Sequence, residues 1–308
     1  DDNEPVPAAV PVFIPCAFAP IFLPPPFGGF PVVHRATPQA LTFNIHPVQL
    51  RDWSARPRTT SAAVQVYGLQ SLAQGGAKAV VDRLRSGAVA ITGCKAAEIA
   101  APIPSQVSQV VDGQPAQPSP PITFFLFNLT EMAALRLKKQ VCWSTKTVAF
   151  FAYDLDPAIP DFLFTLHGFT LRVPQDLERI VKKTLSQPNY RDFTLSLALD
   201  NPEFSGRRPD VVFDTLLRSI TVKVIELGPL GPLVVNVYGK SPTTSPELWC
   251  IWRDALANAE YYDSYTGVGR VRPGWSMSCS GCHGSDHIYL QCPFRRVLGW
   301  NHGTVPSK

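Results

Sequence analysis

The stretch "MSCSGCHGSDHIYLQCPFRR", residues 277–296, decides how the end of this 308-residue chain can fold. It holds three of the chain's seven cysteines and two of its six histidines. A segment this short cannot bury a hydrophobic core, so apolar packing within it cannot hold it together. Closely spaced cysteine and histidine side chains can do so by ligating a metal ion, which then supplies the folding free energy.

Four residues of the stretch, Cys279, Cys282, His287 and Cys292, follow the spacing C-x2-C-x4-H-x4-C. The two-residue gap lets two thiolates converge from one tight turn, and the two four-residue gaps bring a histidine and a third cysteine back toward them. Zn²⁺ prefers four tetrahedral thiolate and imidazole ligands, and a Cys3His set leaves no position open for a catalytic water. The sequence therefore predicts a structural zinc site at these four residues.

Two alternatives for this stretch stay open at the level of sequence. His283 could replace His287 as a ligand, although its place directly after Cys282 makes convergence on the same ion harder. Cys279 and Cys282 could instead form a thioredoxin-type redox pair, but that motif expects a strand followed by a helix, whereas a polar loop follows here. The zinc site is favoured because it also accounts for the next histidine and cysteine.

The stretch lies in the part of the chain that carries the excess positive charge, and the remainder is neutral overall. The net charge is +4, and residues 264–308 hold five basic residues against Asp286 alone. A local basic field attracts polyanions, while guanidinium planes and aromatic rings can stack on unpaired bases. Packing of Tyr289 over the metal is the alternative to base contact. The candidate nucleic-acid contacts are Arg270, Arg272, Trp275, Tyr289, Arg295 and Arg296.

The other cysteines, Cys16, Cys94, Cys142 and Cys250, are isolated in the sequence. An odd total with no regular spacing does not suggest a disulfide framework, so we expect a reducing, intracellular compartment, either cytoplasm or nucleus. The apolar run 5–33 contains nine prolines, which prevent a membrane-spanning helix. We expect a disordered arm there and no membrane partner.

Between residues 146 and 262, strand and helix patterns are mixed. Capping residues and apolar periodicity predict helices over 129–141, 174–187, 209–220 and 245–262. Alternation and β-branched runs predict strands over 146–155, 169–173 and 191–199 and a hairpin over 221–239. The fold class is therefore α+β, a central mixed sandwich of the ferredoxin-like or RRM-like kind, although the RNP1 signature of RRM domains is absent.

Composition divides the chain into five parts. Proline, glutamine and serine dominate residues 101–121, which predicts a linker. The predicted parts are a Pro-rich disordered arm (1–60), a short helical region (61–100), that linker (101–121), the α+β domain (122–263) and the basic tail with the zinc site (264–308).

The ligand spacing is that of the CCHC zinc knuckle of retroviral and retrotransposon Gag proteins. Together with "VNVYGKSPTTSPELWCIWRDAL" (235–256) and "DSYTGVGRVRPGW" (263–275), it makes residues 145–300 resemble the Gag-like or first-ORF proteins of fungal retroelements. The resemblance implies a protein without enzymatic activity that binds and packages single-stranded nucleic acid, with RNA favoured. Viral knuckles usually carry glycine where this chain has Asp286, which would place a negative charge at the binding face.

A second function class is a protein-interaction module. In that hypothesis the knuckle and the apolar arm are docking surfaces, and self-association of the chain belongs to the same class. A continuous basic groove from Arg270 to Arg296 would favour nucleic acid, whereas an apolar patch around Tyr289 and Phe294 would favour a protein partner.

Overall fold

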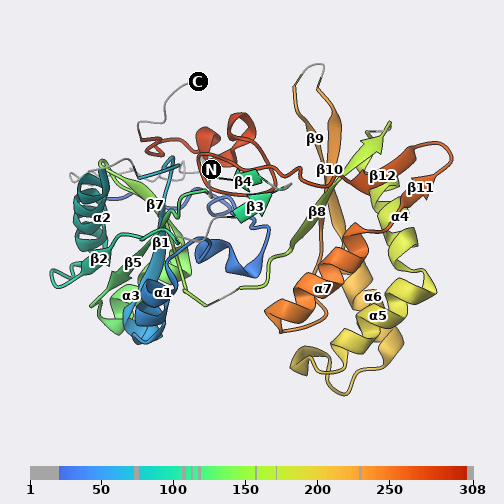
Figure 1. Ribbon diagram of the computed structural model, residues 1–308, viewed down its shortest axis with the longest axis horizontal. Helices are drawn as coiled ribbons and strands as arrows, with labels where there is room; N and C mark the ends of the chain where they lie inside the picture. The colour runs from blue at the N-terminus through green and yellow to red at the C-terminus, as the bar shows by residue number, and fades with distance from the viewer. Residues whose placement is uncertain are drawn as a thin grey trace, which may run out of the picture.

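The computed structural model describes residues 21–72, 76–105, 109–111, 114–116, 119–156, 158–170, 172–228 and 231–303. Its chain forms two lobes, each built on a five-stranded antiparallel sheet (Figure 1). Residues 1–20 of the predicted arm lie outside the described residues. Within the described residues, no helix is both long and apolar enough to cross a membrane.

The first lobe contains the sheet β2-β5-β1-β7-β6 and the helices α1 (Pro47–Ser54), α2 (Gly76–Thr92) and α3 (Glu131–Gln140). Its strands in sheet order are β2 (Glu98–Ala100), β5 (Thr123–Phe127), β1 (Ala62–Val66), β7 (Ala149–Tyr153) and β6 (Cys142–Ser144). A separate hairpin, β3 (Gln109–Val111) and β4 (Gln114–Ala116), lies between β2 and β5 in the sequence.

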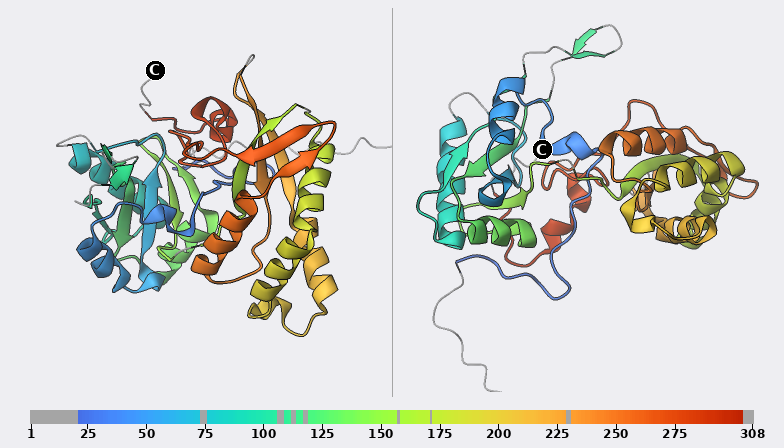
Figure 2. Two further views of the ribbon diagram at one scale, coloured as in Figure 1. Left: turned by 45° about the vertical axis from the view of Figure 1, so that its right-hand side comes forward. Right: turned by 90° about the horizontal axis from the view of Figure 1, so that it is seen from below.

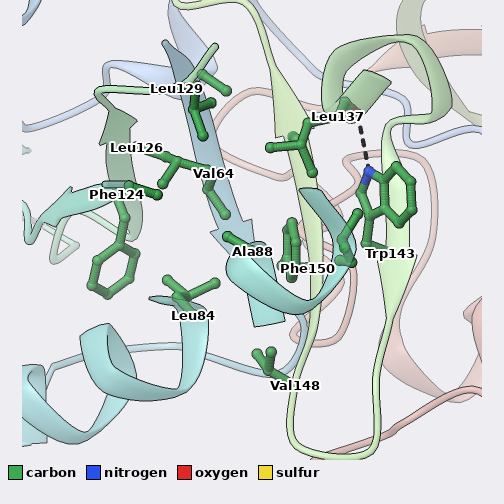
Figure 3. Close-up of a cluster of buried hydrophobic side chains, with 14 of the residues drawn as sticks. Val64, Leu84, Ala88, Phe124, Leu126, Leu129, Leu137, Trp143, Val148 and Phe150 are labelled. Carbon is green, nitrogen blue, oxygen red and sulfur yellow. Dashed lines mark hydrogen bonds between the residues drawn. The ribbon is translucent and has the colours of Figure 1, made fainter. Parts of the chain in front are cut away.

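The core of the first lobe forms where its sheet packs against α2 and α3 (Figure 3). Alternate side chains of three neighbouring strands, including Val64, Phe124 and Phe150, point toward Leu84 of α2 and Leu137 of α3. The residues between them face the other side of the sheet, which is also covered. Both faces of the sheet are therefore buried, which explains why these strands appear in the sequence as continuous apolar runs.

The second lobe contains the sheet β11-β12-β8-β10-β9 and four helices. Its strands in sheet order are β11 (Tyr261–Asp263), β12 (Gly267–Val271), β8 (Phe162–Phe169), β10 (Leu233–Tyr238) and β9 (Thr221–Glu226). The helices are α4 (Pro174–Leu185), α5 (Pro188–Ala198), α6 (Pro209–Ser219) and α7 (Pro246–Ala257). Leu177, Ile180 and Val181 of α4 repeat at helical spacing and are fully buried against the sheet.

The two lobes have the same order of elements. The first runs β1, α2, β2, β5, α3, β6, β7, and the second runs β8, α4 to α6, β9, β10, α7, β11, β12. Corresponding strands occupy corresponding places, since β2-β5-β1-β7-β6 matches β9-β10-β8-β12-β11 position by position. The chain therefore repeats one antiparallel α+β topology twice, with three helices in the second lobe where the first has α2.

The C-terminal segment, residues 272–303, lies between the two lobes (Figures 1 and 2). It contains two short 3-10 helices, Tyr289–Gln291 and Pro293–Arg296. Strand β12 precedes it and belongs to the second sheet, so the described part of the predicted tail, residues 264–303, is not separate from the rest of the chain.

The structure confirms a mixed α+β protein but distributes its elements differently from the predicted parts. Strand β1, in the predicted helical region, pairs with β5 across the predicted linker, with Val64 opposite Phe124. The predicted domain 122–263 is thereby divided between two sheets. Within residues 1–60, Trp53 of α1 is buried against the first sheet, with its ring stacked on Phe125 at 5.1 Å between centroids.

The predicted helices near 129–141, 174–187, 209–220 and 245–262 are confirmed as α3, α4, α6 and α7. The predicted strand over 191–199 is wrong, because residues 191–198 belong to α5 and Leu199 is its C-cap. Pro188 stands in the first turn of that helix, and Thr194 and Ala198, one turn apart, are buried. The strand predicted over 169–173 is displaced, since β8 ends at Phe169.

Candidate metal centre

The C-terminal segment brings Cys279, Cys282, His287 and Cys292 together. Their ligand atoms all lie within 4.8 Å of one another, and none of the four residues is more than 2% exposed. A tetrahedral zinc ion with bonds of about 2.3 Å to sulfur and about 2.0 Å to nitrogen places its ligand atoms about 3.5–3.8 Å apart. Cys282 Sγ and His287 Nε2 are 3.3 Å apart, close to that spacing. The cluster has the size and composition of a closed metal site.

Backbone hydrogen bonds shape the turn that carries the first two thiols. The amide of Cys279 donates to the carbonyl oxygen of Gly284 (2.8 Å), and the amide of Cys282 donates to Cys279 Sγ (3.4 Å). A Cβ atom on Gly284 would lie 3.2 Å from Cε1 of His287 and 3.3 Å from Sγ of Cys282. Glycine at this position therefore lets the backbone pass close to two of the ligands.

His283 does not belong to the cluster. It adopts a positive φ of 62°, and its Nε2 donates to the carbonyl oxygen of Val66 at 2.8 Å. Burial lowers the pKa of His283 to about 4, so the ring is neutral at physiological pH. The structure thus separates the two histidines of the stretch: His287 faces the three thiols, and His283 attaches the loop to β1.

The thiols of the cluster share their protons unequally. Hydrogen bonds from Cys279 and Cys282 lower the pKa of the Cys292 thiol. The hydrogen bond between Cys282 and Cys279 raises the pKa of Cys282 in turn. A thiolate is therefore favoured at Cys292, and binding of a divalent metal would release the remaining thiol protons.

Asp286 is buried beside the ligands. One carboxylate oxygen accepts a hydrogen bond from Nδ1 of His287 at 2.6 Å, and the other accepts one from the hydroxyl of Tyr238 at 2.9 Å. Burial alone would raise the pKa of Asp286, but the hydrogen bond and positive charge of His287 outweigh it and lower that pKa. The Nδ1 contact fixes the ring so that Nε2 faces the thiols, the usual role of a carboxylate behind a metal-binding histidine.

Asp286→Asn is expected to weaken binding of the predicted zinc ion by about 10–100-fold, because the carboxylate that orients His287 and raises its basicity is removed. Competition with a chromophoric chelator measures the affinity. Asp156→Asn is the control, since Asp156 forms only a surface ion pair with Arg58. Equal zinc affinities in the two variants would show that Asp286 does not support the ligand.

Aromatic side chains surround the cluster on the side of the first lobe. Phe294 is fully buried, Trp300 is 4% exposed, and both pack against Phe151 of β7. The hydroxyl of Tyr67 donates to Cys292 Sγ at 3.8 Å. A Cβ on Gly281 would lie 2.8 Å from the Tyr67 ring, so only glycine fits there. This packing excludes water from one side of the metal ligands.

The predicted nucleic-acid contacts fall into two groups. Arg270 and Arg272 lie on and after β12, where Arg270 is paired with Glu260 at 2.5 Å and Arg272 is exposed. Trp275 is half-buried, with its ring 4.2 Å from that of His167 and perpendicular to it.

The second group belongs to the 3-10 helices. Tyr289 is half-buried, and the Arg295 guanidinium lies over its ring at 5.1 Å from the centroid. Arg295 and Arg296 are exposed. Tyr289 packs against the cluster, as the packing alternative predicts, and Arg295 covers one face of its ring.

Several residues that surround the site could not be predicted, because they lie far from residues 277–296 in the sequence. Tyr67, Asn236 and Tyr238 come from strands or strand ends far along the chain. His167 lies opposite Arg270 across the β8–β12 pair, and its buried Nε2 has no hydrogen-bond partner among the described residues. Only the pairing of strands in three dimensions brings these residues to the C-terminal segment.

Comparison with known proteins identifies no relative of this chain. No protein-family model matches the chain, and neither a curated protein nor a solved structure shows significant similarity to it.

Proposed function

We propose that this chain is a zinc-containing, non-enzymatic protein that binds single-stranded nucleic acid, RNA in preference to DNA. The observation that carries the proposal is the arrangement of the C-terminal segment. Its four metal ligands are buried, while Arg272, Arg295 and Arg296 on either side of them are exposed. In this proposal the metal holds the segment in shape, and the arginines and half-buried aromatic rings contact the ligand.

Zinc is the metal that the donor set favours. Three thiolates and one imidazole form a soft, closed set of four, which suits Zn²⁺ and leaves no place for a substrate. Cys279, Cys282, His287 and Cys292 would hold the ion, and its contribution would be structural. This assignment is consistent with a protein that has no catalytic step of its own.

The strand order supports a ferredoxin-like or RRM-like fold for each lobe. Four strands of each sheet, β7-β1-β5-β2 in the first lobe and β12-β8-β10-β9 in the second, have the order of a β-α-β-β-α-β unit. In such a unit the two outer strands of the sheet are the second and the last strand in the sequence. RRM domains bind single-stranded RNA on the sheet face opposite the helices. In the second lobe, Arg270 and His167 lie opposite each other and share that face, part of which is covered by Met277 and Trp275 of the C-terminal segment.

The Gag-like resemblance belongs to the same proposal, in which the protein packages the RNA of a retroelement. The burial of Asp286, which is only 3% exposed, supports it. The carboxylate faces His287 and Tyr238 instead of the surface, so it does not place a negative charge where a nucleic acid would bind.

Binding of labelled oligo(U) and oligo(dT), followed by fluorescence anisotropy across a salt series, tests the proposal. Arg272→Ala is expected to weaken binding to both and to reduce the slope of log K against log salt by about 0.7, the value for one phosphate contact on a single strand. Arg218→Ala, which changes an exposed arginine of α6, is the matched control. No binding of the wild-type chain at low salt would refute the proposal.

Two exposed leucines favour a second candidate function, docking of a protein partner or of another copy of the chain. Leu290 is 72% exposed and Leu298 is 94% exposed, and both belong to the C-terminal segment beside Tyr289 and Phe294. Exposed apolar side chains next to arginine are typical of protein interfaces. Sedimentation of the chain without nucleic acid distinguishes self-association from the proposed binding.

A further inference from the structure

The C-terminal segment is attached to the first lobe by backbone contacts as well as by packing. The amide of Gly68, just after β1, donates to the carbonyl oxygen of Gly281 at 2.8 Å. His283 donates to the carbonyl oxygen of Val66, also at 2.8 Å. Gly281 and His283 flank the ligand Cys282, so the first lobe holds the turn that carries two of the thiols.

The same segment is attached to the second lobe through a different part of the loop. The side-chain amide of Asn236 donates to the carbonyl oxygen of Asp286 at 2.5 Å, and the Tyr238 hydroxyl donates to its carboxylate. Asn236 is itself held by a 2.7 Å hydrogen bond from Thr165 on β8. The residue next to the ligand His287 is therefore fixed by the second sheet.

Few contacts between helices and strands join the two lobes directly. The pairs of described helices and strands with the most extensive contacts all lie within one lobe or the other. The N-terminal segment also crosses between them, since His34 bonds to Asp161 and packs on Tyr238 while Arg35 bonds to Gln65. The carbonyl oxygen of His34 accepts the amide of Ser285, so this second connection is itself tied to the ligand loop.

From these contacts we infer that the metal centre is a clasp between the lobes: metal bound by the four ligands fixes the arrangement of the two sheets. The turn at Cys279 and Cys282 is held by the first lobe, and Asp286 and His287 are held by the second. A metal ion that joins the thiols to His287 therefore joins the two lobes as well. The inference rests on the proposed zinc site and is independent of nucleic-acid binding.

Small-angle X-ray scattering and hydrogen exchange of the full chain, before and after chelation, test the clasp. Removal of zinc is expected to increase the radius of gyration and to abolish protection of the Gly68 and Ser285 amides. Amides of the β1–β5 and β8–β10 pairs should keep their protection, because each lobe has its own core. Unchanged scattering and unchanged protection after zinc loss would overturn the clasp and leave the zinc site standing. A purified chain without zinc would instead refute the site.

A variant that keeps all four ligands tests the inference without chelation, so general unfolding of a metal-free chain cannot explain the result. The double substitution Asn236→Ala with Tyr238→Phe removes the hydrogen bonds from the second sheet to Asp286. It is expected to bind one zinc ion per chain and still to show a larger radius of gyration than the wild type. Tyr262→Phe, at an exposed position on β11, is the control. A scattering curve identical to that of the control would overturn the inference.

Discussion

Cys282→Ser is expected to abolish stoichiometric zinc binding and to lower the melting temperature more than any other single substitution considered for this chain. Structural zinc sites contribute about 10–16 kcal/mol of apparent binding free energy at neutral pH in isolated zinc-finger peptides. Cys282 is fully buried, so its loss also leaves polar ligands buried without their partner. The C-terminal segment should then lose its fixed structure.

Cys94→Ser is the matched control, since Cys94 is half-buried and lies outside the cluster. Thermal unfolding followed by circular dichroism, together with zinc content by mass spectrometry, measures both effects. Cys94→Ser should retain zinc and melt close to the wild type. If the two serine variants melt at the same temperature, the segment does not depend on the metal.

Phe294→Ala is expected to lower the free energy of unfolding by about 3–5 kcal/mol, the usual cost of removing a buried aromatic ring. Phe294 is fully buried, and its ring centroid lies 4.7 Å from that of Trp300 and 5.1 Å from that of Phe151. The ring therefore fills the contact between the ligand segment and the first sheet. A cavity there should weaken both the packing and the position of Cys292.

Urea unfolding of the zinc-loaded protein measures this loss, with Phe27→Ala as the control because Phe27 is fully exposed. The control should change the free energy of unfolding by a few tenths of a kcal/mol at most. An equal and small effect of both substitutions would mean that the aromatic shell does not stabilise the chain.

The ligand set could be predicted from sequence because all four residues lie within fourteen positions of one another and a metal imposes its own spacing. Helices α3 and α7 could be predicted for a similar local reason. Thr130 and Ser245 accept hydrogen bonds from the third amide after them, and this capping is visible in the sequence. The orientation of these helices on their sheets follows from their apolar faces.

The division into two sheets could not be predicted, because it depends on pairing between strands far apart in the chain. Strand β1 lies between β5 and β7, both of which follow the predicted linker. The repeated topology is also hidden, since α2 in the first lobe corresponds to α4, α5 and α6 in the second. Residues 191–199 alternate as a strand would, but contacts such as that of Thr194 with Trp252 of α7 stabilise a helix there.

The role of Asp286 depends on tertiary contacts that the sequence does not reveal. In the sequence it is an acidic residue in a basic segment, placed where a nucleic acid would be expected to bind. In the structure its carboxylate joins His287 to Tyr238, residues separated by almost fifty positions. Nothing local to residues 277–296 could reveal that partner.

X-ray absorption at the zinc K-edge of the purified chain tests whether Cys279, Cys282, His287 and Cys292 hold a zinc ion. The expected result is one zinc ion per chain with three sulfur ligands at about 2.3 Å and one nitrogen ligand at about 2.0 Å. Fewer sulfur ligands, oxygen ligands in their place, or a folded chain that contains no zinc would contradict it.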